Sequence, residues 1–327
     1  MYNFPALDVI VPAYNVEEYL EGCVKSILAA DYPSLKVTIV DDGSGDGTGQ
    51  VADDLGSRYP EKVEVIHQEN GGLSAARNTG IRATSNPYIA FVDADDKVSK
   101  HGYSKMATSM QRSGSKMAVG AVHRFNSKRE WAPWFVDEAH SIDRLSVTGN
   151  SFPPILWNVF AWSKLFEREF FLRVAGEFPV GMLYEDQEVS AKLYLSGEPF
   201  DILSDVVYYW REREDGSSIT ENKIDVYDLE QRLEVARATE RVIRELGDTD
   251  VVEYWYRKLL NEDLWWYFRV VRKASSQYWD TLCDGVAEFA ERAPSTALVG
   301  GPSKRKDLLR LALRRNRGEF HKRLAKP

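Results

Sequence analysis

The sequence predicts an α/β protein in which helices cover both faces of a mostly parallel β-sheet, followed by an α-helical C-terminal region. Over the first hundred residues, short apolar runs alternate with amphipathic helical segments. Several of these apolar runs stop at Asp or Asn, and Gly-rich turns follow two of them. From residue 223 onward only patterns of helical period occur. Repeated strand–helix units of this length imply a parallel sheet with helical crossovers.

The elements of the first hundred residues can be placed in order. Four strands are expected, at residues 7–15, 36–42, 63–68 and 88–96. A first helix is predicted because apolar side chains repeat at steps of three and one, at Val16, Tyr19, Leu20, Cys23, Val24, Ile27 and Leu28. Two further helices follow glycine-rich openings, in residues 43–59 and 70–84.

The next part of the chain is less regular, and the last part is helical. We expect strands at 116–125 and 205–213, with helical pieces between 167 and 196. Four helix patterns then follow, at 226–246, 251–271, 278–293 and 305–315. The sequence therefore predicts an α/β domain over residues 1–222, in halves of about 1–98 and 99–222, and a helical region over residues 223–327.

Composition places the chain among globular proteins. It has 327 residues, of which 43% are hydrophobic and 28% charged. Two distant cysteines suggest neither a disulfide framework nor a zinc site, so a reducing, cytosolic setting is expected. No signal peptide or membrane-spanning run occurs, which predicts a soluble or at most peripheral protein. The last residues show no closing feature, so the chain could equally be a piece of a longer polypeptide.

The charge is distributed unevenly. The net charge is −8, but residues 301–327 carry ten Lys/Arg against two Asp/Glu, a balance of +8 that leaves −16 on the rest. A basic tail after an acidic body often contacts an anionic surface. A solvated amphipathic terminal helix explains the pattern equally well, and both interpretations stay open.

Polar side chains follow each of the first four predicted strands. Asn15 follows the first, Asp41 and Asp42 close the second, Asn70 follows the third, and residues 93–96 close the fourth. Because open α/β sheets bind ligands beyond the carboxyl ends of their strands, we expect these four clusters to meet on one rim.

The rim contains a candidate cation site. Asp93 and Asp95 form an Asp-x-Asp where the fourth strand breaks into a turn, so both carboxylates can converge on one divalent cation with substrate phosphates completing its shell. Like charges this close are destabilising unless something positive lies among them. The alternative is an ordinary acidic turn.

Two glycine-rich segments could bring backbone close to a ligand. The segment after Asp41 and Asp42 contains neither GxGxxG nor a P-loop, so dinucleotide-binding and P-loop folds are not indicated. An ordinary βα turn is the alternative there. In the second segment, Arg77 near the start of a helix could hold a phosphate or could bridge to a rim aspartate.

Two further groups lie in the irregular part. Glu185 and Asp186 begin a predicted helix, where a carboxylate tends to stay ionised, as a general base must, although the helix dipole alone favours acidic residues there. Arg211 and Arg213 alternate at a strand end and could clamp a diphosphate or form a solvated strand edge.

Five segments occur together in a recognisable order: "VIVPAYN", "IVDDGSGDGT", "NGGLSAARNTGI", "FVDADD" and "YEDQEVSAKLY". Over residues 8–222 they resemble the family 2 inverting glycosyltransferases of GT-A fold. The bacterial enzymes that build or decorate teichoic acids, capsules and other surface glycans are the most similar in character. The resemblance does not extend to residues 223–327.

This resemblance implies a set of site residues. The rim would bind a UDP-sugar, with UDP-GlcNAc or another UDP-hexose favoured, and a Mn²⁺ or Mg²⁺ ion. The implied donor-binding residues are Pro12, Tyr14, Asp41 and Asn70 around uracil and ribose, Arg77 toward the nucleotide, and Asp93, Arg211 and Arg213 at the diphosphate. The implied metal ligands are Asp95 and Asp93, the implied catalytic base is Asp186, and the acceptor side would include Glu185, Trp162 and Lys164.

One departure from the family affects the metal site. Many relatives place a histidine in the loop that here reads "REREDGSSIT", but no histidine occurs between His140 and His321. A third protein ligand is either absent, or Arg211, Arg213, Ser217 and Ser218 hold the diphosphate with less reliance on metal.

The resemblance implies transfer of a sugar to a hydroxyl of a surface-polymer, polyol-phosphate or lipid-linked acceptor, with a β-linkage formed. The expected setting is cytoplasmic or peripheral at the inner face of the membrane, with contact through the basic tail. No nucleic acid partner is expected, and the helical region could form a homo-oligomer through its tryptophans. The alternative function is a catalytically silent nucleotide-sugar-binding scaffold that acts through its helical C-terminus. Nucleotidyl transfer fits poorly, since the first turn lacks a Gly-rich basic signature.

Overall fold

The computed structural model describes residues 4–213, 223–299 and 302–326. The chain divides into two compact units, residues 1–214 and 215–327. The predicted domain boundary at 222/223 adjoins residues 214–222, which lie outside the described part.

The first unit is built on one mixed sheet. In the described residues it has ten strands, in the order β3-β2-β1-β4-β9-β6-β10-β5, with β7 paired to β6 and β8 to β10. The strands are β1 (Leu7–Ala13), β2 (Leu35–Asp41), β3 (Val63–His67), β4 (Tyr88–Phe91), β5 (Lys97–Val98), β6 (Met117–Phe125), β7 (Glu130–Trp131), β8 (Arg144–Val147), β9 (Lys164–Glu167) and β10 (Phe200–Arg211). Strands β1 to β4 pair in parallel, as does β6 with β10, whereas β9 runs antiparallel between β4 and β6.

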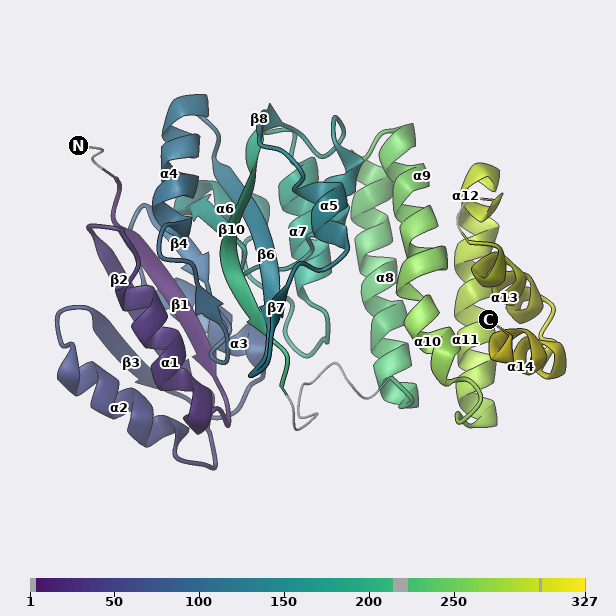
Figure 1. Ribbon diagram of the computed structural model, residues 1–327, viewed down its shortest axis with the longest axis horizontal. Helices are drawn as coiled ribbons and strands as arrows, with labels where there is room; N and C mark the ends of the chain where they lie inside the picture. Colours follow the sequence, from purple (N-terminus) through teal and green to yellow (C-terminus); the bar gives the residue numbers. More distant parts are fainter. Residues whose placement is uncertain (1–3, 214–222, 300–301, 327) are drawn as a thin grey trace. The chain divides into compact units, whose positions relative to one another are not determined.

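Helices lie on both faces of this sheet (Figure 1). They are α1 (Glu17–Leu28), α2 (Thr48–Arg58), α3 (Leu73–Ala83), α4 (Gly102–Ser113), α5 (Phe135–Ala139), α6 (Arg168–Val174) and α7 (Asp186–Leu195), with a 3₁₀ turn at Pro153–Trp157. The α/β fold class is therefore confirmed. Helix α4 was not predicted, although Tyr103, Met106, Ala107 and Met110 form a buried stripe of helical spacing.

The second unit is helical, as predicted. Its helices are α8 (Val226–Leu246), α9 (Thr249–Lys258), α10 (Trp265–Val270), α11 (Ser276–Arg292), α12 (Ser295–Val299), α13 (Ser303–Leu313) and α14 (Arg317–Ala325). Four of them begin at a polar side chain that accepts a backbone N–H of the first turn: Asp225, Asp248, Ser275 and Asn316. None of the helices in the described ranges is long and apolar enough to cross a membrane.

The helix expected over residues 251–271 is interrupted. A π-helical turn at Leu259–Asp263 separates α9 from α10. Asp263 lies there between two buried cations, Lys258 at 2.8 Å and Arg232 at 2.6 Å. The periodicity of apolar residues does not reveal this interruption. The π-helical turn accompanies a buried ion pair with Arg232 of α8, which a local pattern cannot show.

Candidate active site

The carboxyl ends of the parallel strands place the predicted rim residues together. Asp41 is the last residue of β2 and lies in register with Ala13 of β1 and His67 of β3. The loop after β1 is tied to the loop after β2, because Asn15 Oδ1 accepts the Gly45 N–H at 2.8 Å. Beside it, Pro12 is buried and Tyr14 is 50% exposed. An exposed aromatic ring at this rim is available for stacking on a planar base.

Asp42, expected only as a member of the rim cluster that closes the second strand, organises the loop that carries Asn70. Its carboxylate accepts the N–H groups of Gly71 at 2.9 Å and Gly72 at 2.8 Å, at the start of α3. Its carbonyl oxygen accepts the Asn70 side-chain amide at 3.0 Å. Gly72 has φ +86°, which glycine adopts without strain. The sequence signal available for Asp42 was its place next to Asp41 at the end of the strand, whereas its contact with the start of α3 is seen only in the fold.

Asp41 is oriented by a histidine. Its Oδ2 lies 2.9 Å from Nδ1 of His67, and the other ring nitrogen lies 3.0 Å from Oδ1 of Asp53. Both ring nitrogens face acceptors, and only the imidazolium can donate from both. Hydrogen bonds to Asp53 and Asp41 accordingly raise the pKa of His67 above its ordinary value.

The His67 contacts predict a pH-dependent stability. Because the folded-state pKa of His67 is raised, its contribution is fully present below about pH 6.5, the ordinary histidine value, and is lost as the pH rises through the folded-state pKa. We expect the Tm advantage of the wild type over His67→Gln to shrink between pH 6 and pH 9. Thermal unfolding of both proteins across this range measures it, and a Tm difference independent of pH would contradict the assignment.

The centre of the site is the buried guanidinium of Arg77, on α3. Its Nη2 lies 2.9 Å from Oδ1 of Asp93, and its Nη1 lies 2.5 Å from Oε1 of Glu185 and 2.8 Å from Oδ1 of Asp186. Arg77 is 1% exposed. Its ion pairs connect the turn after β4 to the start of α7. These ion pairs make Arg77 a bridge between rim carboxylates, and its predicted contact with a nucleotide stays a prediction.

The three carboxylates around Arg77 carry more negative charge than one guanidinium neutralises. Burial raises the pKa of Glu185 to about 7, and the neighbouring Asp186 adds to this effect while Arg77 opposes it. Partial burial raises the pKa of Asp93 to about 6, again against Arg77. Burial alone would lower the pKa of Arg77, but the carboxylates raise it. The rim therefore favours a further positive charge.

The turn after β4 is fastened to the end of β10. Asp96 is buried, and its two oxygens accept the Tyr208 hydroxyl at 2.8 Å and the Arg211 N–H at 2.7 Å. The Arg211 Nε donates to the Asp95 carbonyl at 2.6 Å, and the Arg213 Nε donates to Oδ2 of Asp95 at 2.7 Å. Both arginines thus lie beside the Asp-x-Asp, where buried Asp96 holds the backbone of Arg211 and Asp95 holds the side chain of Arg213.

The residues fit a cation shared with a diphosphate better than a cage made of protein ligands alone. No group of three or more His, Cys, Asp or Glu residues in the described part is arranged to hold a metal. Asp93 and Asp95 are hard oxygen donors with excess negative charge around them, which suits Mg²⁺ or Mn²⁺ bound by one or two carboxylates plus substrate phosphates. Ser217 and Ser218, considered with Arg211 and Arg213 as groups that hold the diphosphate, lie outside the described residues.

The three residues expected on the acceptor side, Glu185, Trp162 and Lys164, are all buried. Trp162 is 4% exposed and stacks on Tyr208, with ring centroids 4.1 Å apart. Lys164 is fully buried in β9, and its amine donates to carbonyls of the preceding segment. Any effect of Trp162 or Lys164 on an acceptor therefore passes through the residues they support.

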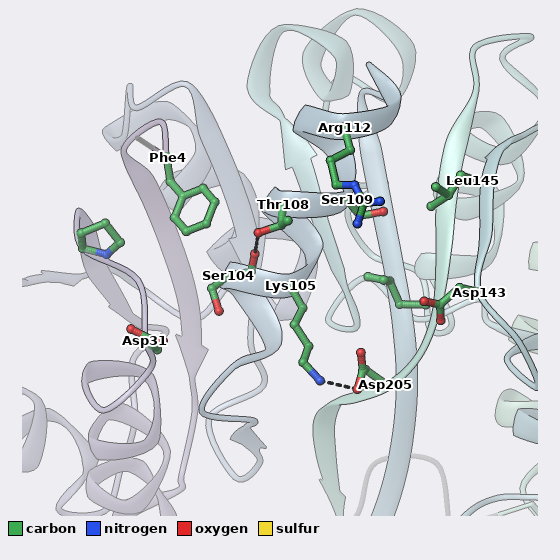
Figure 2. Close-up of a pocket in the computed structure, with 12 residues that line it drawn as sticks. Phe4, Asp31, Ser104, Lys105, Thr108, Ser109, Arg112, Asp143, Leu145 and Asp205 are labelled. Atoms are coloured by element: carbon green, nitrogen blue, oxygen red, sulfur yellow. Dashed lines mark hydrogen bonds and ion pairs between the residues drawn. The ribbon is translucent and has the colours of Figure 1, made fainter. Parts of the chain in front are cut away.

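A cavity of about 700 Å³ lies away from this rim (Figure 2). Phe4 and Asp31, among its lining residues, precede β1 and β2, so the cavity lies at the amino ends of these strands. Lys105 of α4 pairs there with Asp205 of β10. None of the predicted site residues lines this cavity.

Comparison with known proteins identifies the family. The profile described as glycosyl transferase family 2 matches residues 8–173, about half of the chain and most of the first unit. The chain belongs to this family. The chain is similar to GlyA of Streptococcus pneumoniae serotype 4, described as a glycosyltransferase, with 32% identity over 63% of this chain and 30% of that protein. EpsJ of Bacillus subtilis, also described as a glycosyltransferase, is 30% identical over 66% of this chain and 63% of that protein. The matches thus span less than two thirds of either relative.

A solved structure resembles nearly the whole chain. The crystal structure of S. aureus TarS residues 1–349 in complex with UDP-GlcNAc has a TM-score of 0.74 and 21% identity, and covers 98% of this chain and 90% of that chain. At this identity the likeness shows the fold alone, and it confirms the GT-A fold predicted from the sequence. It also extends over the helical residues 223–327, which the sequence resemblance does not cover.

Proposed function

We propose that the protein is an inverting glycosyltransferase that moves a sugar from a UDP-sugar to an acceptor hydroxyl with the help of a divalent cation. The observation that carries this proposal is the Arg77 cluster, in which one buried guanidinium holds Asp93 of the Asp-x-Asp and Asp186 of α7. Arg77 thereby fixes Asp93, which is proposed to bind the donor, and Asp186, which is proposed as the base, on one rim. A module that only bound nucleotide would have no use for the second group.

Asp186 is the proposed catalytic base. It is the first residue of α7 and lies on the same rim as the Asp-x-Asp. Arg77 holds its Oδ1, and the Ala161 N–H donates to its Oδ2 at 3.2 Å. The carboxylate would take the proton of the acceptor hydroxyl while that oxygen forms a bond to the anomeric carbon and the bond to the UDP oxygen breaks. A single displacement converts an α-linked donor into a β-linked product.

The donor would lie across the ends of β1 to β4. Asp41 and Asn70 would hold the uracil and ribose, with Tyr14 and Pro12 beside them. Arg211 and Arg213 lie next to Asp95, where they could bind diphosphate oxygens as charge-assisted donors. A divalent cation held by Asp95 and Asp93 would neutralise negative charge on the departing diphosphate. UDP-GlcNAc is the favoured donor, because TarS, which shares the fold, has been crystallised with it.

The acceptor is proposed to be a surface polymer, a polyol phosphate or a lipid-linked glycan, in keeping with a cytoplasmic enzyme at or near the membrane. The basic tail gives this limited support, since several of its charges are paired within the second unit. Arg315 pairs with Asp284, Arg305 with Glu262, and Arg323 with Asp307. A variant ending at residue 300 should bind anionic vesicles more weakly if the remaining charges act in docking, and unchanged binding would remove this part of the proposal.

Donor binding tests the proposed function. We expect calorimetry with UDP-GlcNAc, UDP-Glc, UDP-Gal, UDP-GalNAc, UDP and a dTDP-sugar to show one preferred UDP-sugar, bound more tightly with Mn²⁺. Asp95→Asn should weaken the metal-dependent binding by about tenfold or more, because a charged oxygen ligand is lost. Asp205→Asn, an aspartate at the opposite end of the strands, is the matched control and should bind like the wild type. Failure of every nucleotide to bind would favour the scaffold alternative.

A further inference from the structure

The segment that leads into β9 is attached along one face of α7. Three residues of this helix, Asp186, Ser190 and Tyr194, are spaced four apart and therefore share a face. Each of them forms a hydrogen bond with the backbone of a different residue in the segment 158–161. The contacts are Tyr194 hydroxyl to Asn158 carbonyl at 2.8 Å, Ser190 hydroxyl to Val159 carbonyl at 2.6 Å, and Ala161 N–H to Asp186 Oδ2 at 3.2 Å.

Lys164 fastens the same segment from the strand side. Its ammonium donates to the Asn158 carbonyl at 3.1 Å, to the Asn158 side-chain oxygen at 3.0 Å and to the Phe160 carbonyl. These are as many hydrogen bonds as an ammonium can donate. Together with Ser190 and Tyr194, Lys164 therefore engages the carbonyls of residues 158, 159 and 160, and leaves the Ala161 N–H directed at Asp186.

Burying the Lys164 ammonium costs free energy, which suggests that this side chain does more than fill space. Lys164 is fully buried, and burial lowers its pKa to about 7. An apolar side chain of the same length would fill the space without removing an amine from water. The remaining polar contacts are also satisfied, since Asn158 donates to the neutral ring of His140, whose Nδ1–H donates to the Leu203 carbonyl. The network is thus a complete support for one short segment.

We propose that Lys164 and Ser190 are positioning residues of the reaction, which hold residues 158–161 so that the Ala161 N–H fixes the Asp186 carboxylate. This inference rests on the proposed role of Asp186 as the base. With Arg77 on Oδ1 and Ala161 on Oδ2, the carboxylate is held from both sides, and its plane is set relative to the rim. Misplacement of a reacting group by about 1 Å can reduce a rate by about 100-fold.

Two variants and one control test the proposal. Lys164→Met removes the ammonium at similar length, and Ser190→Ala removes a single hydroxyl. Lys116→Met is the control, because Lys116 is 41% exposed and pairs only with Glu167 among the described residues. We expect kcat for UDP release from UDP-GlcNAc without acceptor to fall about 100-fold in Lys164→Met and about tenfold in Ser190→Ala. KM for UDP-GlcNAc and Kd for UDP should stay within about threefold, and the control should match the wild type.

A second measurement needs no turnover. Amide hydrogen exchange at Ala161 should be slow in the wild type and faster in both variants, while exchange in β1 and β2 stays unchanged. Unchanged exchange at Ala161 in Ser190→Ala, which should fold even if Lys164→Met does not, would overturn the proposal. So would a kcat within threefold of the wild type in that variant.

Asp186→Asn measured alongside separates this inference from the proposed function. If Asp186→Asn is inactive while both positioning variants keep the wild-type kcat, the base stands and the positioning role is wrong. If Asp186→Asn itself keeps the wild-type kcat, the base assignment is wrong, and the inference that depends on it falls too.

Discussion

Replacing Asp186 by Asn should reduce kcat for UDP-sugar turnover by about 1,000-fold while the Kd of UDP changes by less than about threefold. The amide keeps the size of the side chain and can still accept the Ala161 N–H, but it cannot take a proton from an attacking hydroxyl. Because UDP contacts are proposed to come from other residues of the rim, nucleotide binding should survive. Steady-state UDP release and calorimetry measure the two quantities.

A matched control lies two residues further along the same helix. Glu188 pairs with Lys192 at 2.7 Å and has no contact with the Arg77 cluster among the described residues. Glu188→Gln removes one negative charge from α7 and should leave kcat close to the wild-type value. Turnover by Asp186→Asn comparable to that of Glu188→Gln would contradict the assignment of the base.

Replacing Arg77 by Met should destabilise the protein by about 3–5 kcal/mol, because three carboxylates would then share a buried space without their cation. Arg77→Lys keeps the charge, but a single amine cannot reproduce the two nitrogens that reach β4 and α7 separately, so it should restore only part of the stability and little of the activity. Urea unfolding measures the free-energy change.

Glu185 offers an internal check on this prediction. Glu185→Gln removes one of the competing negative charges, so the double variant with Arg77→Met should be more stable than the sum of the single changes. If Arg77→Met lost less than about 1 kcal/mol, the guanidinium would not be what holds the rim together.

The fold and the rim were predictable because both depend on local patterns. Apolar runs such as residues 7–13 locate buried strands, and the rule that ligands bind at carboxyl ends of strands placed Asp41, Asn70 and Asp93 on one edge. The spacing of Asp186, Ser190 and Tyr194 was also visible, although its partner segment was not.

The contacts that organise the site were not predictable from local patterns. Arg77 and Glu185 are 108 positions apart, and nothing in their neighbourhoods indicates that they pair. The family resemblance placed Lys164 on the acceptor side, and only the fold shows that its buried amine meets the carbonyls of its own preceding segment. Nothing in the sequence assigned Asp42 a role different from that of Asp41, because two adjacent carboxylates at a strand end look alike.

The most direct test of the central claim is the configuration of the sugar first released. Proton NMR of the hydrolysis of the preferred α-linked UDP-sugar, with Mg²⁺ and without acceptor, distinguishes the two anomers before they equilibrate. A single displacement with water activated by Asp186 predicts that the β-anomer appears first. Early appearance of the α-anomer, or no hydrolysis by a protein that binds the donor and Mg²⁺, would contradict the account.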